Sequence, residues 1–495
     1  MQVLERVLMP IYGYSEIQDD KTLKPFSRES IFRQFILNVI GALLREDTYG
    51  VTSFVRSLHL PGSCYQNILH MFHSSGINIQ VLRHAWIHSV RKAAPLFYSA
   101  SELKKKPEDQ SITLVIDHKK NSKEARHMPL VHKMFQESDT QSKAQYIFGH
   151  CWGAVGILIG KNNRLACLPL IADLEEGLDG LAQWKEASVR NESMIIRLYR
   201  NAIECAGKLE HNCRFLADRA FLNKDGLKMI DDYNNTSKYA LHILTKCKNG
   251  VTGYTEPEKP IHPKKGRPRK KGKTVKLNDL FKTKNESFTT EEMTIYGEKK
   301  SVRYYCIDLL WGQGYYKKLR FVLSVMDTST RSILVTDDLT LTAKEIIEGY
   351  CLRYRVETMF RTMSQNGTFN YRFWTKSMDK LNRFMKSDDP DPLSKIRSPF
   401  RRRKILECIQ AIEMYVLVCS IATGINQIIS VTVDIDSNLL RWQRTPAKKR
   451  PSEENVAKYI QDLFFDCFRA GVIDGDYRIM QIIRDAQSHE SRASA

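Results

Sequence analysis

Several features that would define a protein class are missing from this sequence. Its 11 cysteines are odd in number and include no Cys-x-x-Cys pair, so neither a disulfide framework nor a zinc ribbon or finger is expected. The most apolar stretch, 405–429, is interrupted by Glu407, Gln410 and Glu413, which predicts a buried core helix and no membrane span. The first residues contain acids and no long apolar segment, so no signal peptide is expected. These absences predict a cytoplasmic protein.

Acidic residues are in the minority. The chain has 76 Lys and Arg against 56 Asp and Glu, a formal net charge of +20 and a pI near 9.3. This excess favours a nucleic acid as partner first and an anionic membrane surface second, although a basic soluble protein without either partner has the same balance. At 495 residues, 42% of them hydrophobic, the chain is expected to fold into several structural units.

Helical patterns dominate both ends of the chain, residues 1–105 and 381–495. A cluster of short helices at the N-terminal end is typical of a helix-turn-helix DNA-binding unit, and it fits a plain helical packing domain equally well. Apolar periodicity predicts helices at 31–44, 51–59, 64–74, 79–92 and 403–429 and from about 453.

Residues 106–247 alternate between strand and helix patterns. The order of three strands, helix, strand, helix and strand predicts an α/β core with a mixed sheet. An acidic cluster, Asp173, Glu175 and Glu176, is interpreted as a turn after a strand. The predicted strands are 112–117, 145–160, 164–173, 213–218 and 239–244, and the predicted helices are 187–207 and 222–233.

The alternation stops in residues 248–340 and resumes in 341–380. The interrupting segment starts with a basic, proline-containing linker, 259–273, and continues with strand-like runs, so it is predicted to be a mostly β insertion within the core. Thr342 and Glu345 form a capping box, which predicts that a helix of the core begins there.

Two aspartates follow apolar strand patterns directly, Asp117 after "ITLVI" and Asp218 after "CRFLA". In an open α/β sheet, the carboxyl ends of neighbouring strands are the usual site of chemistry. Two carboxylates that emerge at one edge repel each other unless a cation lies between them. Either aspartate alone also fits an ordinary turn or cap residue.

The segment "YCLRYRVETMFR" contains a second pattern. Tyr350, Arg353 and Glu357 lie at offsets 0, 3 and 7, which place them on one face of a single predicted helix. A surface helix commonly has charges at such offsets without any chemistry. With Glu357 as a third carboxylate, however, the set suits two Mg²⁺ ions roughly 3.5–4 Å apart.

These segments resemble the DDE transposases of bacterial insertion sequences, the cut-and-paste class with a ribonuclease H-like core. "LVID" matches the first-aspartate strand, "LADRAFLNKDG" the second-aspartate motif, and "YCLRYRVETMFR" the Y-x2-R-x3-E signature. The resemblance covers roughly residues 110 to 375. It implies that Asp117, Asp218 and Glu357 are catalytic and bind two Mg²⁺ ions, for which Mn²⁺ is expected to substitute. It also implies that Tyr350 and Arg353 face a DNA phosphate.

The resemblance further implies an α/β ribonuclease H-like fold and a DNA transposase activity. Such an enzyme cleaves the DNA backbone at element ends and transfers the 3′-hydroxyl ends to target DNA. Its expected partners are double-stranded DNA and a second copy of the chain in a synaptic complex. Two alternatives stay open: a transposase-derived DNA-binding protein with a decayed site, and a metal-dependent nuclease without strand transfer.

The sequence departs from the family pattern at two places. His118, Lys119 and Lys120 follow the first aspartate, where the family often has a second acid or a threonine, and Ser364 stands where the signature usually has a lysine. Arg361, four residues after Glu357, is predicted to bind the phosphate instead, because a cation there stabilises charge on the phosphoryl oxygens. A salt bridge between Arg361 and Glu357 fits the same spacing.

The linker and the insertion hold further candidates for DNA binding. Arg267 and Arg269 flank a proline and are typical of an arm that enters a narrow minor groove, and Lys270 and Lys271 follow them. A solvated basic linker fits equally well. Trp311 can stack on an unpaired base or can belong to the core.

Overall fold

The computed structural model divides into two compact units. The terminal unit contains Met1–Ala100, His118–Met194 and Glu357–Ala495, and the central unit contains Ser101–Asp117 and Ile195–Val356. The chain therefore crosses between the units directly after Asp117 and directly before Glu357. The structure describes residues 1–48, 50–99, 102–136, 145–161, 164–175, 193–258, 268–326, 330–382, 393, 396–433, 452–469 and 477–488.

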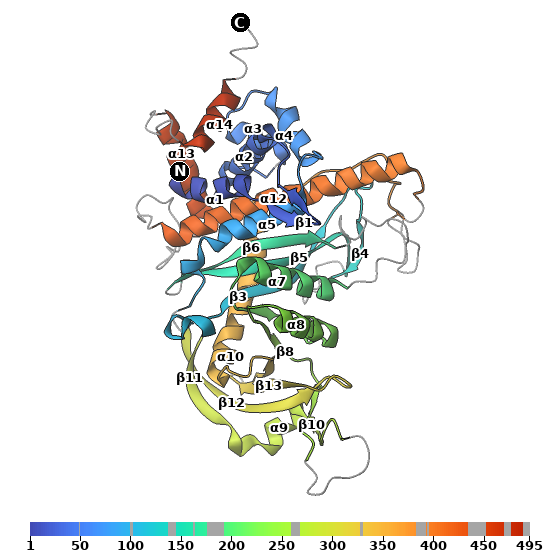
Figure 1. The fold of residues 1–495 in the computed structure, drawn as a ribbon, viewed down its shortest axis with the longest axis vertical. Helices are drawn as coiled ribbons and strands as arrows, with labels where there is room; N and C mark the ends of the chain where they lie inside the picture. The colour runs from blue at the N-terminus through green and yellow to red at the C-terminus, as the bar shows by residue number, and fades with distance from the viewer. Residues whose placement is uncertain are drawn as a thin grey trace. The chain divides into compact units, whose positions relative to one another are not determined.

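The central unit is built on a mixed sheet, as predicted (Figure 1). Its strands follow the order β10-β9-β12-β13-β14-β8-β7-β3, and β11 pairs with β12. The pairs β3–β7 and β7–β8 are parallel, whereas β8–β14 and the pairs beyond it are antiparallel. The strands are β3 (Ile112–Ser122, which continues into the terminal unit), β7 (Cys213–Ala217), β8 (Leu241–Lys246), β9 (Thr252–Tyr254), β10 (Thr274–Lys276), β11 (Thr289–Ile295), β12 (Glu298–Trp311), β13 (Lys317–Val325) and β14 (Arg331–Thr336).

Helices pack against this sheet and complete an α/β arrangement. Tyr199 of α7 contacts Phe215 of β7 edge-on, with ring centroids 5.3 Å apart. A Cβ atom at Gly226 of α8 would lie 2.3 Å from the Tyr199 ring, so only glycine allows the two helices this approach. The helices of the unit are η2 (Glu102–Lys104), η3 (Pro107–Asp109), α7 (Met194–Leu209), η5 (Arg219–Phe221), α8 (Lys224–Thr236), α9 (Leu277–Thr283), η6 (Asn285–Ser287), α10 (Ala343–Tyr350) and η7 (Cys351–Tyr354).

The predicted helix boundary at Thr342 is confirmed. The Thr342 side chain accepts a hydrogen bond from the Glu345 backbone, and the Glu345 carboxylate accepts one from the Thr342 backbone N–H. The expectation of one continuous helix behind this boundary is wrong. The chain forms α10, then the 3₁₀ turn η7, then α11 (Arg355–Gln365), so Tyr350 and Glu357 belong to different helices.

The terminal unit is mainly helical. Helix α12 packs against α2, α4, α5 and strands β5 and β6, and Figure 1 shows α2, α3 and α4 on one side of it and these strands on the other. The predicted helices and strands of this region are confirmed, and the hairpin β1–β2 and strand β4 were not predicted. The elements are α1 (Gln2–Gly13), β1 (Glu16–Gln18), β2 (Lys21–Leu23), α2 (Glu29–Leu44), α3 (Val51–Ser57), α4 (Cys64–Phe72), α5 (Ile79–Arg91), η1 (Ala94–Leu96), β4 (His132–Phe135), β5 (Tyr146–Lys161), β6 (Arg164–Leu174), α12 (Pro399–Thr432), α13 (Glu453–Arg469) and α14 (Arg478–Gln487).

Helix α12 is long and apolar enough to cross a membrane by length and composition, yet 83% of its most apolar window is buried inside the protein. This burial agrees with the predicted core helix. Within the described ranges the cysteines are free thiols, in line with the absence of a disulfide framework.

The interpretation of the acidic cluster as a turn after a strand is confirmed for Glu175, which lies in a turn directly after β6, whereas Glu176 lies outside the described residues. The interpretation is wrong for Asp173, which lies inside β6, is buried, and forms an ion pair with Arg83 of α5 at 2.8 Å. The same Arg83 nitrogen lies 3.1 Å from the carboxylate of Glu413 on α12. A strand interior accepts the Asp173 carboxylate because Arg83 pairs with it, and the single guanidinium is shared with Glu413 across three elements.

Candidate active site

The two strand-end aspartates lie side by side in the central unit. Strands β3 and β7 are parallel neighbours, and their register pairs Val115 with Leu216. The same register, carried two residues further, sets Asp117 opposite Asp218. The expectation that both carboxylates emerge at one edge of the sheet is therefore confirmed, because the carboxyl ends of parallel strands share that edge.

Asp218 is held by its backbone. Its carbonyl oxygen accepts a hydrogen bond of 2.7 Å from the hydroxyl of Thr245, a buried residue of the adjacent strand β8, and one of 2.9 Å from the backbone N–H of Phe221. The carboxylate takes no part in these contacts and is 42% exposed. These two hydrogen bonds fix the backbone of Asp218, and its carboxylate is available to another partner.

That partner is Arg353 of η7. One guanidinium nitrogen, Nη2, lies 3.5 Å from Asp117 Oδ2 and 3.9 Å from Asp218 Oδ1. A cation between two carboxylates offsets their mutual repulsion. The distances are those of an ion pair, so the guanidinium is shared between the two acids.

Tyr350 contacts this arginine through a side-chain hydrogen bond. In a 3₁₀ turn with three residues per turn, side chains at i and i+3 are aligned, and η7 therefore brings Tyr350 directly beside Arg353. Burial, with smaller contributions from Asp218 and Tyr296, raises the pKa of the Tyr350 hydroxyl to about 12, although Arg353 lowers it. The neutral hydroxyl orients the guanidinium next to the two acids.

Glu357, the third predicted acid, is the first residue of the segment Glu357–Ala495 of the terminal unit. It lies in the first turn of α11 and is exposed, and so is Arg361 one turn further. A separation of one turn fits a salt bridge and a phosphate contact alike, so the role of Arg361 stays a prediction. Ser364 donates its hydroxyl to the carbonyl of Phe360 at 2.6 Å, so its polar group is used within its own helix.

Lys119 is a basic residue for which the sequence motifs predict no role. Its ammonium group lies 6.0 Å from the Phe360 ring centroid of α11 and 5.7 Å from that of Phe369. Residues two apart in a strand point to the same face, and Lys119 follows Asp117 at that spacing in β3. The alternation of side chains along a strand is therefore the sequence signal that identifies Lys119 as a candidate.

The described residues contain no group of three or more His, Cys, Asp and Glu side chains placed to hold a metal ion. What the central unit brings together is an aspartate pair with one arginine and one tyrosine. Carboxylate oxygens that share a cation are a suitable donor set for Mg²⁺, which prefers oxygen ligands. The participation of Glu357 as a third ligand stays a prediction.

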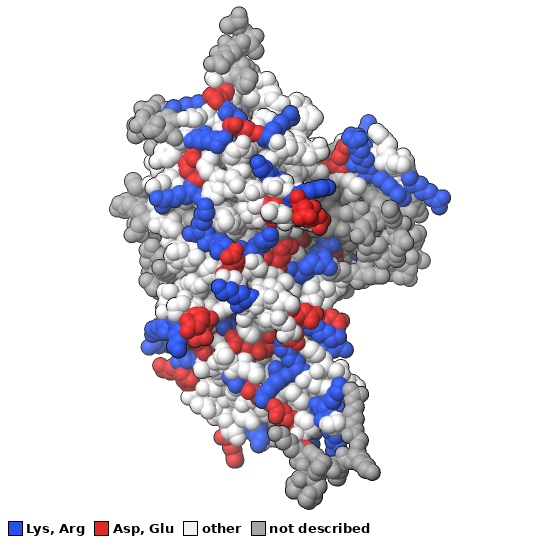
Figure 2. Space-filling view, in the orientation of Figure 1, with Lys and Arg blue, Asp and Glu red and all other residues white. Residues whose placement is uncertain are grey.

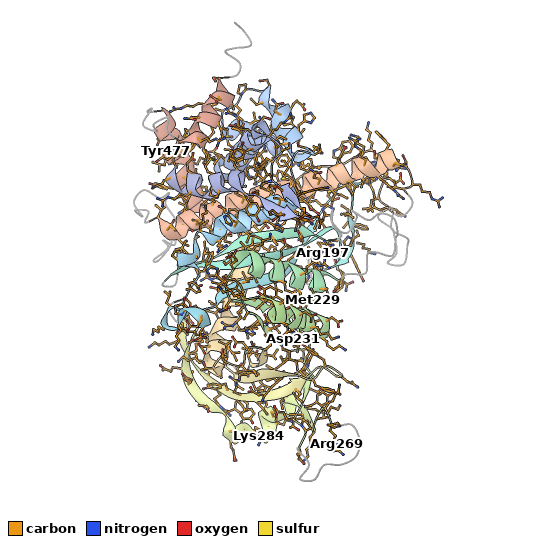
Figure 3. The ribbon with its side chains drawn as sticks, viewed as in Figure 1. Arg197, Met229, Asp231, Arg269, Lys284 and Tyr477 are labelled. Carbon is orange, nitrogen blue, oxygen red and sulfur yellow. The ribbon has the colours of Figure 1, made fainter. Side chains whose placement is uncertain are left out.

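The basic linker is described from residue 268 onward, so Arg267 lies outside the described residues. Arg269 and Lys270 are exposed, and Figure 3 shows Arg269 and Lys284 at the same end of the central unit. Lys271 is anchored instead: its ammonium group lies 4.0 Å from the Tyr254 ring centroid and 5.6 Å from that of Tyr316. The anchor attaches the basic segment to the β insertion.

Trp311 ends β12 and is half-buried opposite Lys317. Gly312 and Gly314, which follow it, have φ angles of +83° and +82°, a conformation that favours glycine and allows the tight turn into β13. A partly exposed ring at a turn fits both the predicted base stacking and a core position at the rim.

The chain matches no protein-family model and no curated protein. Its function is therefore inferred from the arrangement of these residues.

Proposed function

We propose that this protein is a DNA transposase with a ribonuclease H-like core, which cleaves the ends of a mobile DNA element and joins the 3′-hydroxyl ends to target DNA. The observation that carries the proposal is the placement of Asp117 and Asp218 at the ends of adjacent parallel strands around Arg353. An acid pair at this edge of a sheet, close to a phosphate-binding type of side chain, suits phosphodiester chemistry.

The two aspartates, with Glu357 as the proposed third ligand, fit a pair of divalent ions. Mg²⁺ ions bound there would activate the attacking water or 3′-hydroxyl and stabilise the leaving oxygen, and Mn²⁺ is expected to substitute. The chain itself contributes the negative charge that such ions need. It also contributes the rigid sheet edge that holds the acids, through the Thr245 contact to Asp218.

Arg353 and Tyr350 are proposed to receive the DNA backbone. A guanidinium offers a planar fork of donors that matches phosphate oxygens, and Tyr350 limits the directions in which this fork can point. Ser364 brings no charge to the site. We therefore assign the further phosphate contact to Arg361, and Lys119, on the unit that carries Glu357, is a second basic group suited to it.

The remaining partners follow from the same proposal. Arg269, Lys270 and Lys271, with Arg267 and Trp311, are proposed to contact double-stranded DNA at the element ends. Both ends must be held while they are processed, so we expect a homodimer in the synaptic complex. We expect the protein in the cytoplasm, on DNA and not on a membrane.

A plasmid assay tests the proposal. The full chain is incubated with Mg²⁺ and a supercoiled plasmid that carries the DNA flanking its own gene, and the products are separated on a gel. We expect nicks at the element ends and joined products, and the same from the control variant Asp225→Asn, whose exposed carboxylate lies on α8. Nicks without joined products would indicate a nuclease, and DNA binding without nicks would indicate a DNA-binding protein with a decayed site.

A further inference from the structure

A groove in the terminal unit has no role in the proposed chemistry. It has a volume of about 860 Å³ and lies between the end of α4, the segment around Trp374 and the first turns of α12. We call it the Trp374 groove. Its lining residues on α12 include Arg402, Arg403, Lys404 and Glu407.

The lining carries more positive than negative charge. Arg403 and Lys404 both contact the carboxylate of Glu407, at 3.0 and 2.8 Å, and Arg402 donates to the carbonyl of Ile396 at 2.8 Å. The lining thus contains one acid and three cations. The Arg403 side chain is 79% exposed, and Figure 2 shows Lys and Arg side chains gathered where α12 begins.

Aromatic rings stand beside these cations and face water. Trp374 in the groove is 55% exposed, and Phe400, on the first turn of α12, is 67% exposed. Large aromatic side chains usually bury most of their surface, and exposed ones close to cations are typical of surfaces that bind a partner. Rings beside Arg and Lys are the combination that single-stranded nucleic acids require, because bases stack on the rings and phosphates pair with the cations.

We propose that the Trp374 groove binds a DNA strand that has an unpaired base, with the base stacked on Trp374 and the neighbouring phosphates on Arg402, Arg403 and Lys404. A base-paired duplex covers its ring faces, so it offers Trp374 nothing to stack on except at an end. An acidic peptide satisfies the cations and leaves both rings exposed. This inference rests on the proposed function, since strand cleavage and joining expose unpaired bases.

Fluorescence anisotropy of the full chain with a labelled single-stranded oligonucleotide and with the matching duplex tests the groove. Trp374→Ala should weaken single-strand binding about tenfold, because base–aromatic stacking is removed, and duplex binding should change less than about twofold. Trp374→Phe, which keeps a ring, should retain most of the affinity. Thermal melting followed by circular dichroism checks that each variant is folded.

A charge variant provides the second arm. Replacing Arg402, Arg403 and Lys404 by Gln should reduce the slope of log affinity against log salt for the single strand by about 2, at about 0.7 for each phosphate contact that is removed. Replacing Lys248, Lys282 and Lys299, exposed basic residues of the central unit, by Gln should leave the slope unchanged. A photo-crosslink from a bromouracil oligonucleotide should map to the peptide that contains Trp374.

Unchanged single-strand affinity in both groove variants would overturn the proposal. A polyglutamate control would overturn it too, if polyglutamate binds the wild type as tightly as the oligonucleotide does and fails to bind the charge variant. The groove would then bind an acidic protein. Both results leave the plasmid assay untouched. In a further outcome, the wild type nicks no plasmid while both groove variants lose single-strand binding. This result would reject the proposed transposase activity and support the proposed binding of single-stranded DNA in the Trp374 groove.

Discussion

Arg353 of the central unit and Arg83 of the terminal unit each face two carboxylates, and the two clusters differ in distance and burial. The ion-pair distances at Arg83 are 2.8 and 3.1 Å, and its acids are nearly inaccessible, with the Glu413 side chain 4% exposed. The distances at Arg353 are 3.5 and 3.9 Å, and the Asp218 side chain is 42% exposed.

The difference indicates which cluster holds the fold together and which is available for chemistry. A buried ion cluster is stable only while every charge keeps its partner, because water cannot replace a missing one. At the edge of the central sheet, water and incoming ions reach the Asp218 carboxylate, which is 42% exposed, and Asp117 keeps 17% exposure, so their partner can be exchanged more readily than at Arg83. The same residue types thus stabilise the fold at Arg83 and form a candidate active site at Arg353.

The largest expected effect is the loss of cleavage. Asp117→Asn or Asp218→Asn should lower plasmid cleavage by about 10³-fold or more, the size of effect seen when catalytic groups are removed. DNA binding, measured by anisotropy, should stay within about twofold, since no basic residue changes. Glu357→Gln is expected to behave alike. A variant of these three that cleaves at the wild-type rate would contradict its assignment.

Breaking the buried cluster should instead cost stability. Arg83→Met leaves the carboxylates of Asp173 and Glu413 buried without a cation, and should lower the free energy of unfolding by about 3–5 kcal/mol in urea denaturation. Arg353→Met is the matched variant and should lower it by less than Arg83→Met does, because water hydrates the Asp218 carboxylate, which is 42% exposed, and reaches Asp117, which keeps 17% exposure. Equal losses in the two variants would remove the distinction between the clusters.

Lys123 sharpens the contrast, since it is a buried cation of the terminal unit close to carbonyl groups and a ring. Its ammonium group lies 3.2 Å from the Tyr371 carbonyl and 3.6 Å from the Tyr371 ring centroid, and burial, assisted by Arg372, lowers its pKa from 10.5 to about 7. Between these pKa values the unfolded chain binds a proton that the folded protein lacks. Stability should therefore rise with pH above 7.

From pH 7 to pH 9 the gain from Lys123 should be about 2 kcal/mol. Urea denaturation at both pH values measures it as the difference between the wild type and Lys123→Met, in which the other titrating groups are retained. An equal pH dependence in the two proteins would show that Lys123 keeps an ordinary pKa.

Arg353 should compete with metal ions for the two aspartates. Removing it in Arg353→Met should tighten Mn²⁺ binding about tenfold in the absence of DNA, equivalent to about 1.4 kcal/mol for the removal of one ion-pair competitor. Electron paramagnetic resonance of free Mn²⁺ gives the affinity directly. Arg320→Met, which removes a partner of Asp308 on β12, is the control and should leave the affinity unchanged. Weaker Mn²⁺ binding in Arg353→Met would refute the competition.

The smallest effect is expected at the linker. Replacing Arg267, Arg269, Lys270 and Lys271 by Gln should reduce the slope of log affinity against log salt for duplex DNA by about 0.9 for each phosphate that is no longer bound. Lys271→Gln alone should contribute less than Arg269→Gln, because Lys271 is held on Tyr254. An unchanged slope in the fourfold variant would make the segment a linker only.

Local signals account for the parts of the fold and the site that could be predicted. The apolar run before Asp117, the run before Asp218 and the capping box at Thr342 are each contained in a few neighbouring residues, and the structure confirms the element that each one predicts. The interruption of the helix by η7 has only a weak local signal, Gly349, which directly precedes Tyr350 at the end of α10. A single glycine lowers helix propensity without defining a break, so the prediction of one helix from Tyr350 to Glu357 was wrong.

The sequence by itself determined the elements, the strand-end aspartates and the excess of positive charge, because each depends on residues close together in the chain or on composition. Only the tertiary structure decided which partner each charge has. Arg83 is 330 residues from Glu413, and Arg353 meets Asp117 and Asp218 only because β3 and β7 pair in parallel. Burial then separates the two clusters: dry surroundings make the ion pairs at Arg83 structural, and hydrated surroundings leave the acids at Arg353 open to exchange.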